Sequence, residues 1–463
     1  MNLNEAENDP AEINRRKFIK GGSLGAMMML MGGVPLLADD KTNNAALGGD
    51  TGFSTIGAPV SCAVIGCGIW GREVIQTLAL LPNAPVVAIC DTYESFLRRA
   101  KESAPKAEIF TDYRKVLEMP SVQAVIVATP SHQHREIVVA ALKAGKHVYC
   151  EAPLASTVED ARAIAQAAKD AVKVNFQSGL QTRSDPRKRF ILDFIRSGAI
   201  GKAIMARAQW HKKQSWQRTA PTPEREKAAN WRLSKETSAG LIGEIGIHQL
   251  DLVSWFLNER PAAVTGFGGI LSYSDGRDVA DTIQTVFEFP SKANFSYDCT
   301  LGNSFDADYS ILYGAYAAVM FRDDKAWLFK EVDSPLLGWE IYAAKDVFYK
   351  ETGISLRAGA SKSVSAANAG PESPFATSAL HYALAAFIQN SRVTATGVND
   401  FNSSYGADAD GLAEYLAGPT VAKARLPAAG YKEGLVATVS AIKANEAIIH
   451  GQKIVLQKEW FEI

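Results

Sequence analysis

The chain has 463 residues, of which 47% are apolar, and its formal net charge is −1. This composition is typical of a globular protein with enough length for two or three domains. The near-neutral charge argues against nucleic acid as a partner, and no long block of like charges is present.

Two adjacent arginines near the N-terminus, Arg15 and Arg16, precede a weakly hydrophobic segment at residues 21–37. The arrangement resembles a twin-arginine export signal, so we expect residues 1–38 to engage the twin-arginine export machinery. The protein would then be exported to the periplasm, or tethered to the membrane if the signal stays uncleaved. A chance Arg-Arg pair beside a membrane anchor is the alternative, although the apolar segment is short for a spanning helix.

Residues 39–58 are rich in Asp, Asn, Gly, Thr and Ala without periodicity, which predicts a linker. The five cysteines cannot all pair, and no C-x-x-C spacing occurs among them. We therefore expect buried free thiols and no metal site.

A glycine-rich motif, G-x-G-x-x-G, begins directly after a short apolar run and is followed by a helical pattern. Gly66 permits the tight turn, Gly68 lets a pyrophosphate approach the backbone, and Gly71 lets helix and strand pack closely. About 20 residues later a second apolar run ends in Asp91, which suits the ribose hydroxyls of NAD and repels a 2′-phosphate. The motif predicts a dinucleotide site that prefers NAD to NADP. Its expected backbone contacts include those of Ile69 and Trp70.

Strands and helices alternate through the next hundred residues, which predicts a parallel sheet with helices on both faces. The expected strands after the glycine motif are 86–90, 124–128, 147–150 and 173–177, and the expected helices are 72–80, 95–102, 113–118, 135–144 and 158–168. Ligands of such sheets bind at the carboxyl ends of the strands. Asp91, the segment 129–134, Glu151 and Gln177 all lie at those ends.

The pattern changes after residue 180, where strands follow one another over short connections. Helices are expected at 186–196, 379–389 and 435–450, and strands at 203–210, 263–270, 282–289, 295–300, 310–313, 317–322 and 325–330. Such an order predicts an antiparallel or mixed sheet. We divide the chain into the signal (1–38), the linker (39–58), an NAD-binding domain (59–180) and a substrate and oligomerisation domain (181–463).

Glu244, His248, Asp251 and Trp255 have spacings that place them on one face of a helix. His248 has a pKa range suited to taking a proton from a hydroxyl, and Glu244 could orient its imidazole or bind a substrate hydroxyl. Asp251 and Gln177 are expected to contact substrate. The alternative is a helix held by internal hydrogen bonds, and a metal site would need a third ligand that we do not find.

Two further groups of residues suggest ligand contacts. Thr129, Pro130 and His134 could cover the cofactor, although loop histidines commonly hydrogen-bond within their own loop. Trp231, Lys212 and Lys213 belong to a stretch of tryptophans and cations that suits a sugar, although tryptophans are more often core residues.

These motifs occur in the order found in the glucose–fructose oxidoreductase / inositol dehydrogenase (Gfo/Idh/MocA) family, which the chain resembles over nearly its whole length after the linker. The shared features are the glycine loop, Thr-Pro-x-x-x-His ending at His134, Glu151-x-Pro153, and the run from Glu244 through His248 to Asp251. The resemblance implies a Rossmann domain followed by an α/β domain with an open-faced sheet. It also implies a bound nicotinamide nucleotide, with Glu151 and Pro153 in its site, and hydride transfer at a sugar or cyclitol carbon.

Two departures from the family pattern concern the chemistry. The family's Glu-Lys-Pro lysine, which supports proton transfer, is replaced by Ala152, and the usual aspartate four residues before the histidine is Glu244. His248 would act without that lysine, or Lys212 or Lys213 would supply a cation. NAD-dependent glycosidases of the family also lack the lysine, and they are an exception to two-carboxylate hydrolysis.

Three functions therefore stay open. The first is an oxidoreductase acting on a sugar, glycoside or cyclitol, with His248 as base and Glu244 assisting. The second is a redox-neutral glycosidase or lyase, and the third is a sugar-binding protein with weak catalysis. We expect NAD to be tightly bound, because an exported enzyme has no obvious supply of it. The resemblance further implies a homodimer or homotetramer.

Overall fold

In this computed structural model, the structure describes residues 57–322, 325–336, 345–348, 351–356, 378–406 and 409–463. The expected signal segment and all but the last two residues of the expected linker lie outside these ranges. The chain divides into two compact units, which are described separately. The larger unit comprises Gly52–Pro186, Ala206–Asp308 and Ala376–Ile463, and the smaller includes Arg187–Met205 and Tyr309–Phe375.

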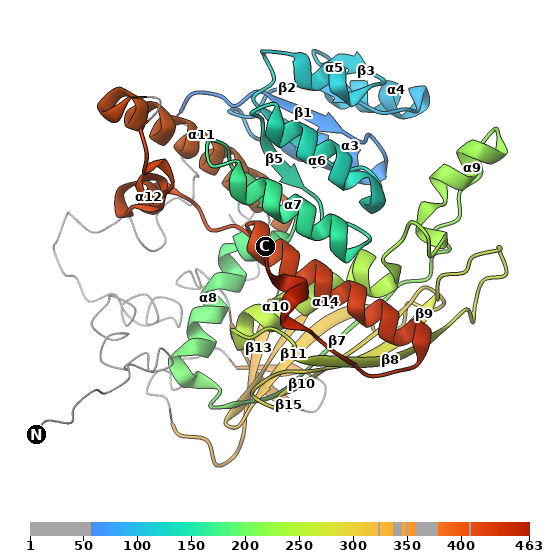
Figure 1. Cartoon of the computed structure of the whole chain (residues 1–463). Helices are drawn as coiled ribbons and strands as arrows, with labels where there is room; N and C mark the ends of the chain where they lie inside the picture. The colour runs from blue at the N-terminus through green and yellow to red at the C-terminus, as the bar shows by residue number, and fades with distance from the viewer. Residues whose placement is uncertain (1–56, 323–324, 337–344, 349–350, 357–377, 407–408) are drawn as a thin grey trace, which may run out of the picture. The chain divides into compact units, whose positions relative to one another are not determined.

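The larger unit contains a six-stranded parallel sheet with the strand order β3-β2-β1-β4-β5-β6 (Figure 1). Its strands are β1 (Cys62–Ile65), β2 (Val86–Cys90), β3 (Glu108–Phe110), β4 (Ala124–Val127), β5 (His147–Cys150) and β6 (Phe176–Ser178). The connecting helices are α3 (Ile69–Ala79), α4 (Glu94–Ser103), α5 (Tyr113–Glu118), α6 (His134–Lys143) and α7 (Val158–Asp170). This arrangement confirms the predicted parallel-sheet domain.

The central strands β1, β2 and β4 are apolar along their whole length because both faces of this sheet are covered. Val64 of β1 packs in one core cluster with residues of α3 and α4, whereas its neighbour Ile65 packs in a second cluster with residues of α6 and α7. Residues from near the C-terminus complete both clusters: α11 (Ala379–Tyr405) joins the first and α14 (Tyr431–His450) the second. Helices from the C-terminal part of the chain therefore help to cover both faces of the parallel sheet.

The larger unit also contains strands of a second sheet. The neighbouring pairs β10–β9, β9–β8 and β8–β16 of this sheet are antiparallel. Its strands are β7 (Ala203–His211), β10 (Asn294–Thr300), β9 (Thr282–Glu288), β8 (Ala263–Gly269) and β16 (Ile454–Val455). Helix α14 contacts β8 (Figure 1). The close packing of α14 on β8 requires glycine in the strand. A Cβ on Gly266 would lie 3.0 Å from the Ile448 side chain, and one on Gly268 would lie 2.8 Å from it. The predicted, mostly antiparallel second sheet is thus confirmed.

The smaller unit contains five antiparallel strands in the order β14-β15-β13-β12-β11. They are β11 (Asp308–Gly314), β12 (Ala317–Arg322), β13 (Lys325–Lys330), β14 (Lys345–Phe348) and β15 (Glu351–Leu356). Helix α8 (Pro186–Phe194) continues into a π-helical turn at Ile195–Ala199. The strands β14 and β15 were not among the expected elements.

The remaining helices of the larger unit are α9 (Pro223–Ala229), α10 (Ile247–Leu257), α12 (Leu412–Ala417) and α13 (Pro419–Ala424). Short 3₁₀ turns lie at Ser131–Gln133, Gln181–Ser184, Trp231–Leu233 and Lys458–Phe461, and a π-helical turn at Ile242–Gly246. Helix α11 runs 16 residues beyond the expected end at 389. Within the described residues, no helix is long and apolar enough to span a membrane.

Candidate active site

The glycine loop between β1 and α3 has the geometry of a phosphate cradle. A Cβ on Gly66, whose φ is +95°, would lie 2.6 Å from the carbonyl of Ala128, and one on Gly71 would lie 1.8 Å from the Gly66 oxygen. A Cβ on Gly68 would meet nothing within 4 Å. The first and third glycines are thus required by packing, whereas the second borders open space at the N-terminus of α3. A helix N-terminus of this kind offers unpaired N–H groups to a pyrophosphate.

Asp91, at the carboxyl end of β2, is hydrogen-bonded to the glycine loop. Its Oδ2 accepts a hydrogen bond from the Cys67 N–H at 2.7 Å, and its Oδ1 accepts one from the Tyr93 N–H at 2.8 Å. Burial raises the pKa of Asp91, while these backbone hydrogen bonds act in the opposite direction. Each carboxylate oxygen keeps a further lone pair, so the residue can still accept hydrogen bonds from ribose hydroxyls. Its assignment to NAD stays a prediction.

Buried polar atoms follow β4 and β5 at the same edge of the sheet. Thr129 Oγ1 and Glu151 Oε1 are both buried without a hydrogen-bond partner among the described residues. Burial raises the pKa of Glu151 from 4.5 to about 7, against the opposing hydrogen bonds from the Trp70 indole and the Ala152 N–H. Unpaired buried oxygens are costly unless a bound group completes them. Together with the cradle at Gly68, they fit a dinucleotide lying along this edge.

His134 does not face this groove, and its expected cofactor contact is wrong. The side chain is 1% exposed, with Nε2 lying 2.9 Å from the Thr129 carbonyl oxygen and Nδ1 lying 3.1 Å from that of Pro153. Burial lowers the pKa of His134 to about 4. The imidazole therefore links the segments after β4 and β5. Of the other expected contacts, Ile69 and Trp70 are exposed at the start of α3, and Pro130 directly precedes the turn at Ser131.

Glu244 is joined to the end of β4 across a long stretch of sequence. Its carboxylate oxygens lie 3.3 and 3.2 Å from the Ser131 hydroxyl, and Oε1 accepts a hydrogen bond from the Ala239 N–H at 3.2 Å. Arg232 Nε lies 3.7 Å from Oε2, and the Glu244 side chain is only 2% exposed. Burial raises the pKa of Glu244, although Arg232 and these donors favour the carboxylate. Ser131 lies within the segment 129–134 that was expected at the ligand-binding edge, but it was not singled out as a site residue.

His248 differs from its neighbours in having free ring nitrogens: no described residue hydrogen-bonds to its imidazole. Burial lowers the pKa of His248 from 6.5 to about 4, so the ring is neutral at pH 7. We expected Glu244 to be able to orient this ring, but its carboxylate engages Ser131 and Ala239 instead. The π-helical turn at Ile242–Gly246 explains the difference, because it breaks the α-helical spacing that would align the two side chains.

Two expected substrate contacts, Asp251 and Gln177, are buried and bonded within the protein. Asp251, 3% exposed, forms a two-point ion pair with Arg183, with Nη2–Oδ1 at 2.8 Å and Nε–Oδ2 at 2.9 Å. Gln177, 2% exposed, donates from Nε2 to the Ala383 carbonyl at 2.7 Å. A buried carboxylate needs a charged partner, so Asp251 is committed to Arg183. Gln177 is anchored through its Nε2, whereas its Oε1 is buried without a partner among the described residues, so its contact with substrate stays a prediction. Asp251 thereby ties α10 to the turn after β6.

Aromatic and cationic side chains lie near Ser131. The Trp231 ring lies 6.0 Å from that of His132, and the Arg232 guanidinium lies 4.5 Å from the Trp231 ring centroid. Lys212 and Lys213 are exposed, and in the described residues no ion pair or hydrogen bond joins their amines to Glu244 or His248. Arg232 is therefore the cation that the structure places beside Glu244, whereas a role for either lysine stays a prediction.

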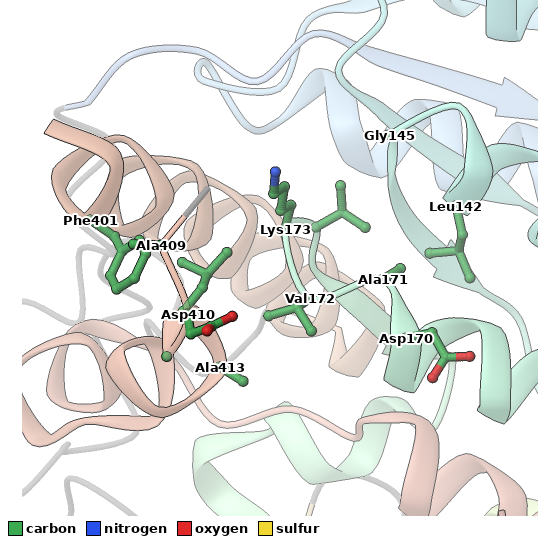
Figure 2. A pocket seen from close by; sticks show the side chains of 13 residues that line it. Leu142, Gly145, Asp170, Ala171, Val172, Lys173, Phe401, Ala409, Asp410 and Ala413 are labelled. Carbon is green, nitrogen blue, oxygen red and sulfur yellow. The ribbon is translucent and has the colours of Figure 1, made fainter. Parts of the chain in front are cut away.

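A separate cavity of about 500 Å³ lies at the opposite edge of the parallel sheet (Figure 2). Gly145 and Lys173, which line it, precede β5 and β6 and so mark the amino ends of the strands. Phe401 of α11 and Asp410 line its other side. Because the glycine loop, Asp91 and Glu151 gather at the carboxyl ends, this cavity is distinct from the candidate active site.

Comparison with known proteins identifies the two halves of this site. A profile described as "Oxidoreductase family, NAD-binding Rossmann fold" matches residues 60–179, and one described as "GFO/IDH/MocA C-terminal domain" matches residues 189–315. Levoglucosan dehydrogenase from Pseudarthrobacter phenanthrenivorans is 29% identical over 211 residues, which are 41% of this chain and 52% of the relative. The 2,7-anhydro-N-acetylneuraminate hydratase of Escherichia coli is 29% identical over 235 residues, which are 50% of this chain and 59% of the relative.

This chain thus spans between half and two thirds of the length of these curated relatives. Among solved structures, a levoglucosan dehydrogenase in complex with NADH and L-sorbose has the same fold, with a TM-score of 0.62 and 18% identity. The match covers 87% of this chain and 100% of that one. The two profiles together match more than half of the chain and meet at the site described above. The chain therefore belongs to the Gfo/Idh/MocA family of oxidoreductases, and its residues 60–179 form the family's NAD-binding Rossmann domain.

Proposed function

We propose that the protein is an NAD-dependent oxidoreductase that acts at a hydroxyl-bearing ring carbon of a sugar, glycoside or cyclitol. The observation that carries the proposal is the contact between Glu244 and Ser131. It brings the segment that holds His248 to the carboxyl end of β4, where the Thr129 hydroxyl is buried without a partner among the described residues. This contact supports a role for His248 as the base beside the bound nucleotide.

His248 is the group suited to take the hydroxyl proton. Its imidazole is neutral above a pKa of about 4, and both ring nitrogens are free of partners among the described residues. NAD, when bound, supplies the hydride acceptor. Loss of a proton and of a hydride from one carbinol gives a ketone, and the cation of Arg232 beside Glu244 favours the negative charge that develops on the substrate oxygen. Arg232 thus supplies a positive charge near the site, where Ala152 has replaced the lysine of the family motif.

A redox-neutral route is the second candidate, and two observations favour it. Ala152 removes the lysine that the family's dehydrogenase motif carries, and one relative is a hydratase rather than a dehydrogenase. In such a route a transient ketone acidifies the neighbouring C–H, a leaving group is eliminated, water adds, and the hydride returns. Net consumption of NAD separates this route from the first one.

The test begins with the purified protein, denatured so that mass spectrometry can identify any released nucleotide. Native protein is then mixed with cyclic sugars, anhydrosugars, cyclitols and aryl glycosides while absorbance at the NADH band is followed. Reduction of bound NAD by a sugar or cyclitol, lost in His248→Ala, supports the oxidoreductase. Aglycone release without net reduction supports the second candidate. Protein that neither carries nor takes up nucleotide would contradict both and leave a sugar-binding role.

We also propose export by the twin-arginine route, on the sequence of residues 1–38 alone. Replacement of Arg15 and Arg16 by lysine should then retain the protein in the cytoplasm, as measured by cell fractionation with immunoblotting. Equal periplasmic amounts of the variant and the unaltered protein would contradict this proposal. Export in the folded state would let the protein load NAD before it leaves the cytoplasm.

A further inference from the structure

Residues 214–232, here termed the bridging segment, run from one end of the nucleotide groove to the other. At the adenosine end, the Tyr93 hydroxyl donates to the Arg225 carbonyl at 3.4 Å, and the Arg225 guanidinium lies 4.8 Å from the Tyr93 ring centroid. Tyr93 adjoins Asp91, to which its N–H donates. At the other end, Trp231 lies against His132, beyond β4. The bridging segment therefore contacts the loops after β2 and after β4, on either side of the glycine loop.

The middle of the bridging segment is held in place by hydrogen bonds. The Arg218 N–H donates to Asn230 Oδ1 at 2.7 Å, and Asn230 Nδ2 donates to the Arg218 carbonyl at 2.8 Å. Arg277, whose side chain is 1% exposed, donates to the Ser215 carbonyl from the β8–β9 connection. These bonds fix the backbone on both sides of Arg218, so its side chain starts from a defined position.

Arg218 is a partly buried cation among other cations. Burial and then the charges of Arg232 and Arg72 lower the pKa of Arg218, so its guanidinium lies within electrostatic reach of both. Arg72 donates to the Cys67 carbonyl of the glycine loop at 3.1 Å, whereas Arg232 approaches Glu244 beside Ser131. In the described part of the chain, no carboxylate lies within 4.0 Å of the Arg218 or Arg72 guanidinium. Glu244 offsets the charge of Arg232, and Asp91 lies within electrostatic reach of Arg72, whereas no carboxylate of the described residues offsets Arg218. The unpaired charge of Arg218 favours a bound anion.

The position of Arg218 identifies that anion. The hydrogen bonds to Asn230 hold Arg218 close to Trp231 at the end of β4. The bridging segment that carries Arg218 contacts the loops on either side of the glycine loop, which contains the open cradle at Gly68. A dinucleotide that runs from Asp91 toward Thr129 has its two negative charges at the middle, on the pyrophosphate. A planar guanidinium binds such oxygens in pairs.

We propose that Arg218 binds the pyrophosphate of NAD from the side opposite the glycine loop, so that the bridging segment retains the cofactor in the protein. This inference rests on the proposed function only in its use of NAD as the ligand. It predicts slow release of nucleotide, because dissociation requires both the loss of the Arg218 contact and movement of the bridging segment past Tyr93 and His132.

The experiment measures binding rather than turnover. Protein freed of nucleotide is titrated calorimetrically with NAD⁺, ADP-ribose and adenosine, using the unaltered protein, Arg218→Gln, and Lys227→Gln as the control. Lys227 is exposed on α9, so its variant removes one cation from the same segment. Arg218→Gln should raise the Kd for NAD⁺ and ADP-ribose by about 10- to 100-fold, leave adenosine unchanged, and lower the salt dependence of binding. Lys227→Gln should change each Kd less than about twofold.

A measurement on the unaltered protein keeps the inference testable if Arg218→Gln does not fold. Phenylglyoxal modifies accessible guanidinium groups, and peptide mass spectrometry reports its reaction at Arg218. ADP-ribose should protect Arg218, whereas adenosine should not. Unchanged Kd values in Arg218→Gln, or equal reaction with and without ADP-ribose, would overturn the inference alone. Unaltered protein that binds no NAD⁺ would overturn the proposed function with it.

Discussion

The hydroxyl of Ser131 and the carboxylate of Glu244 lie within 3.2 Å of each other, although 113 residues separate them in the sequence. Ser131 follows the fourth strand of the parallel sheet, and Glu244 lies in the π-helical turn that leads into α10. The contact therefore joins the nucleotide groove to the helix that carries His248. Both partners are shielded from water, so the bond is stronger than one on the surface.

Ser131→Ala should lower the free energy of unfolding by about 1–3 kcal/mol, because a buried carboxylate loses a donor. The measurement is urea unfolding followed by circular dichroism. A double-mutant cycle with Glu244→Gln should give a coupling of about 0.5–3 kcal/mol. Ser121→Ala, at an exposed turn, should change stability by less than about 0.5 kcal/mol. Additive effects of the two site variants would show that the bond contributes nothing.

His248→Asn should lower kcat about 10²- to 10⁴-fold while leaving the nucleotide content of the protein unchanged, because it removes a general base and not a cofactor ligand. Burial lowers the pKa of His248 to about 4, and protonation abolishes a base. In the unaltered protein, protonation of His248 should thus leave kcat/KM unchanged near neutral pH. It should lower kcat/KM only as the pH drops toward about 4. Steady-state rates on a confirmed substrate provide the test. An acid limb near 6.5 would mean that this imidazole is solvated in the free enzyme.

Asp91→Asn should weaken NAD⁺ binding and narrow the preference for NAD⁺ over NADP⁺ by about tenfold or more. The amide keeps an acceptor for one backbone N–H but no longer repels a 2′-phosphate, and Arg72 lies close enough to attract it. Calorimetric Kd values for both nucleotides give the ratio. Asp193→Asn, at an exposed position, is the charge-matched control. An unchanged ratio would remove Asp91 from the specificity of the site.

Glu151 should make the nucleotide-free protein less stable as the pH rises. Burial raises its pKa from 4.5 to about 7, so between these values the folded chain holds a proton that the unfolded chain has lost. The free energy of unfolding should thus fall by at most about 3 kcal/mol as the pH rises through this range, and change little from this group outside it. Glu151→Gln should remove that part of the pH dependence in urea unfolding, whereas Glu118→Gln, on an exposed side chain, should retain it.

The parallel-sheet domain could be predicted closely because its signals are local. The strand His147–Cys150 and the helix Tyr113–Glu118 have the predicted bounds, since each is an apolar or amphipathic run closed by turn residues. Strand β3 was missed because Glu108–Phe110 is a short, partly exposed edge strand without an alternating pattern. Helix α11 was cut short because the Ser-, Thr- and Asn-containing stretch before Tyr405 has weak intrinsic helix propensity.

The site was less accessible to such reasoning, because its decisive contacts join distant residues. Asp251 was expected to meet substrate, yet its partner Arg183 lies 68 residues earlier and only the fold brings them together. The π-helical turn before His248 carries no sequence signature. A regular helical spacing therefore predicted that Glu244 lies beside His248, whereas its carboxylate contacts Ser131. The adjacency of Ser131 to the Thr-Pro motif was the only sign of its place in the site.

The five cysteines are free and buried in the folded chain. Burial raises the pKa of Cys62, Cys90 and Cys299 to about 12 and also raises those of Cys67 and Cys150. Since the thiolate is the reactive form, oxidants and alkylating agents in the surroundings find almost no nucleophilic sulfur on the folded protein. The unfolded chain, by contrast, would expose all five thiols at once. Folding before contact with an oxidising compartment would thus protect the chain from mispaired disulfides, one of which would involve the sulfur inside the glycine loop.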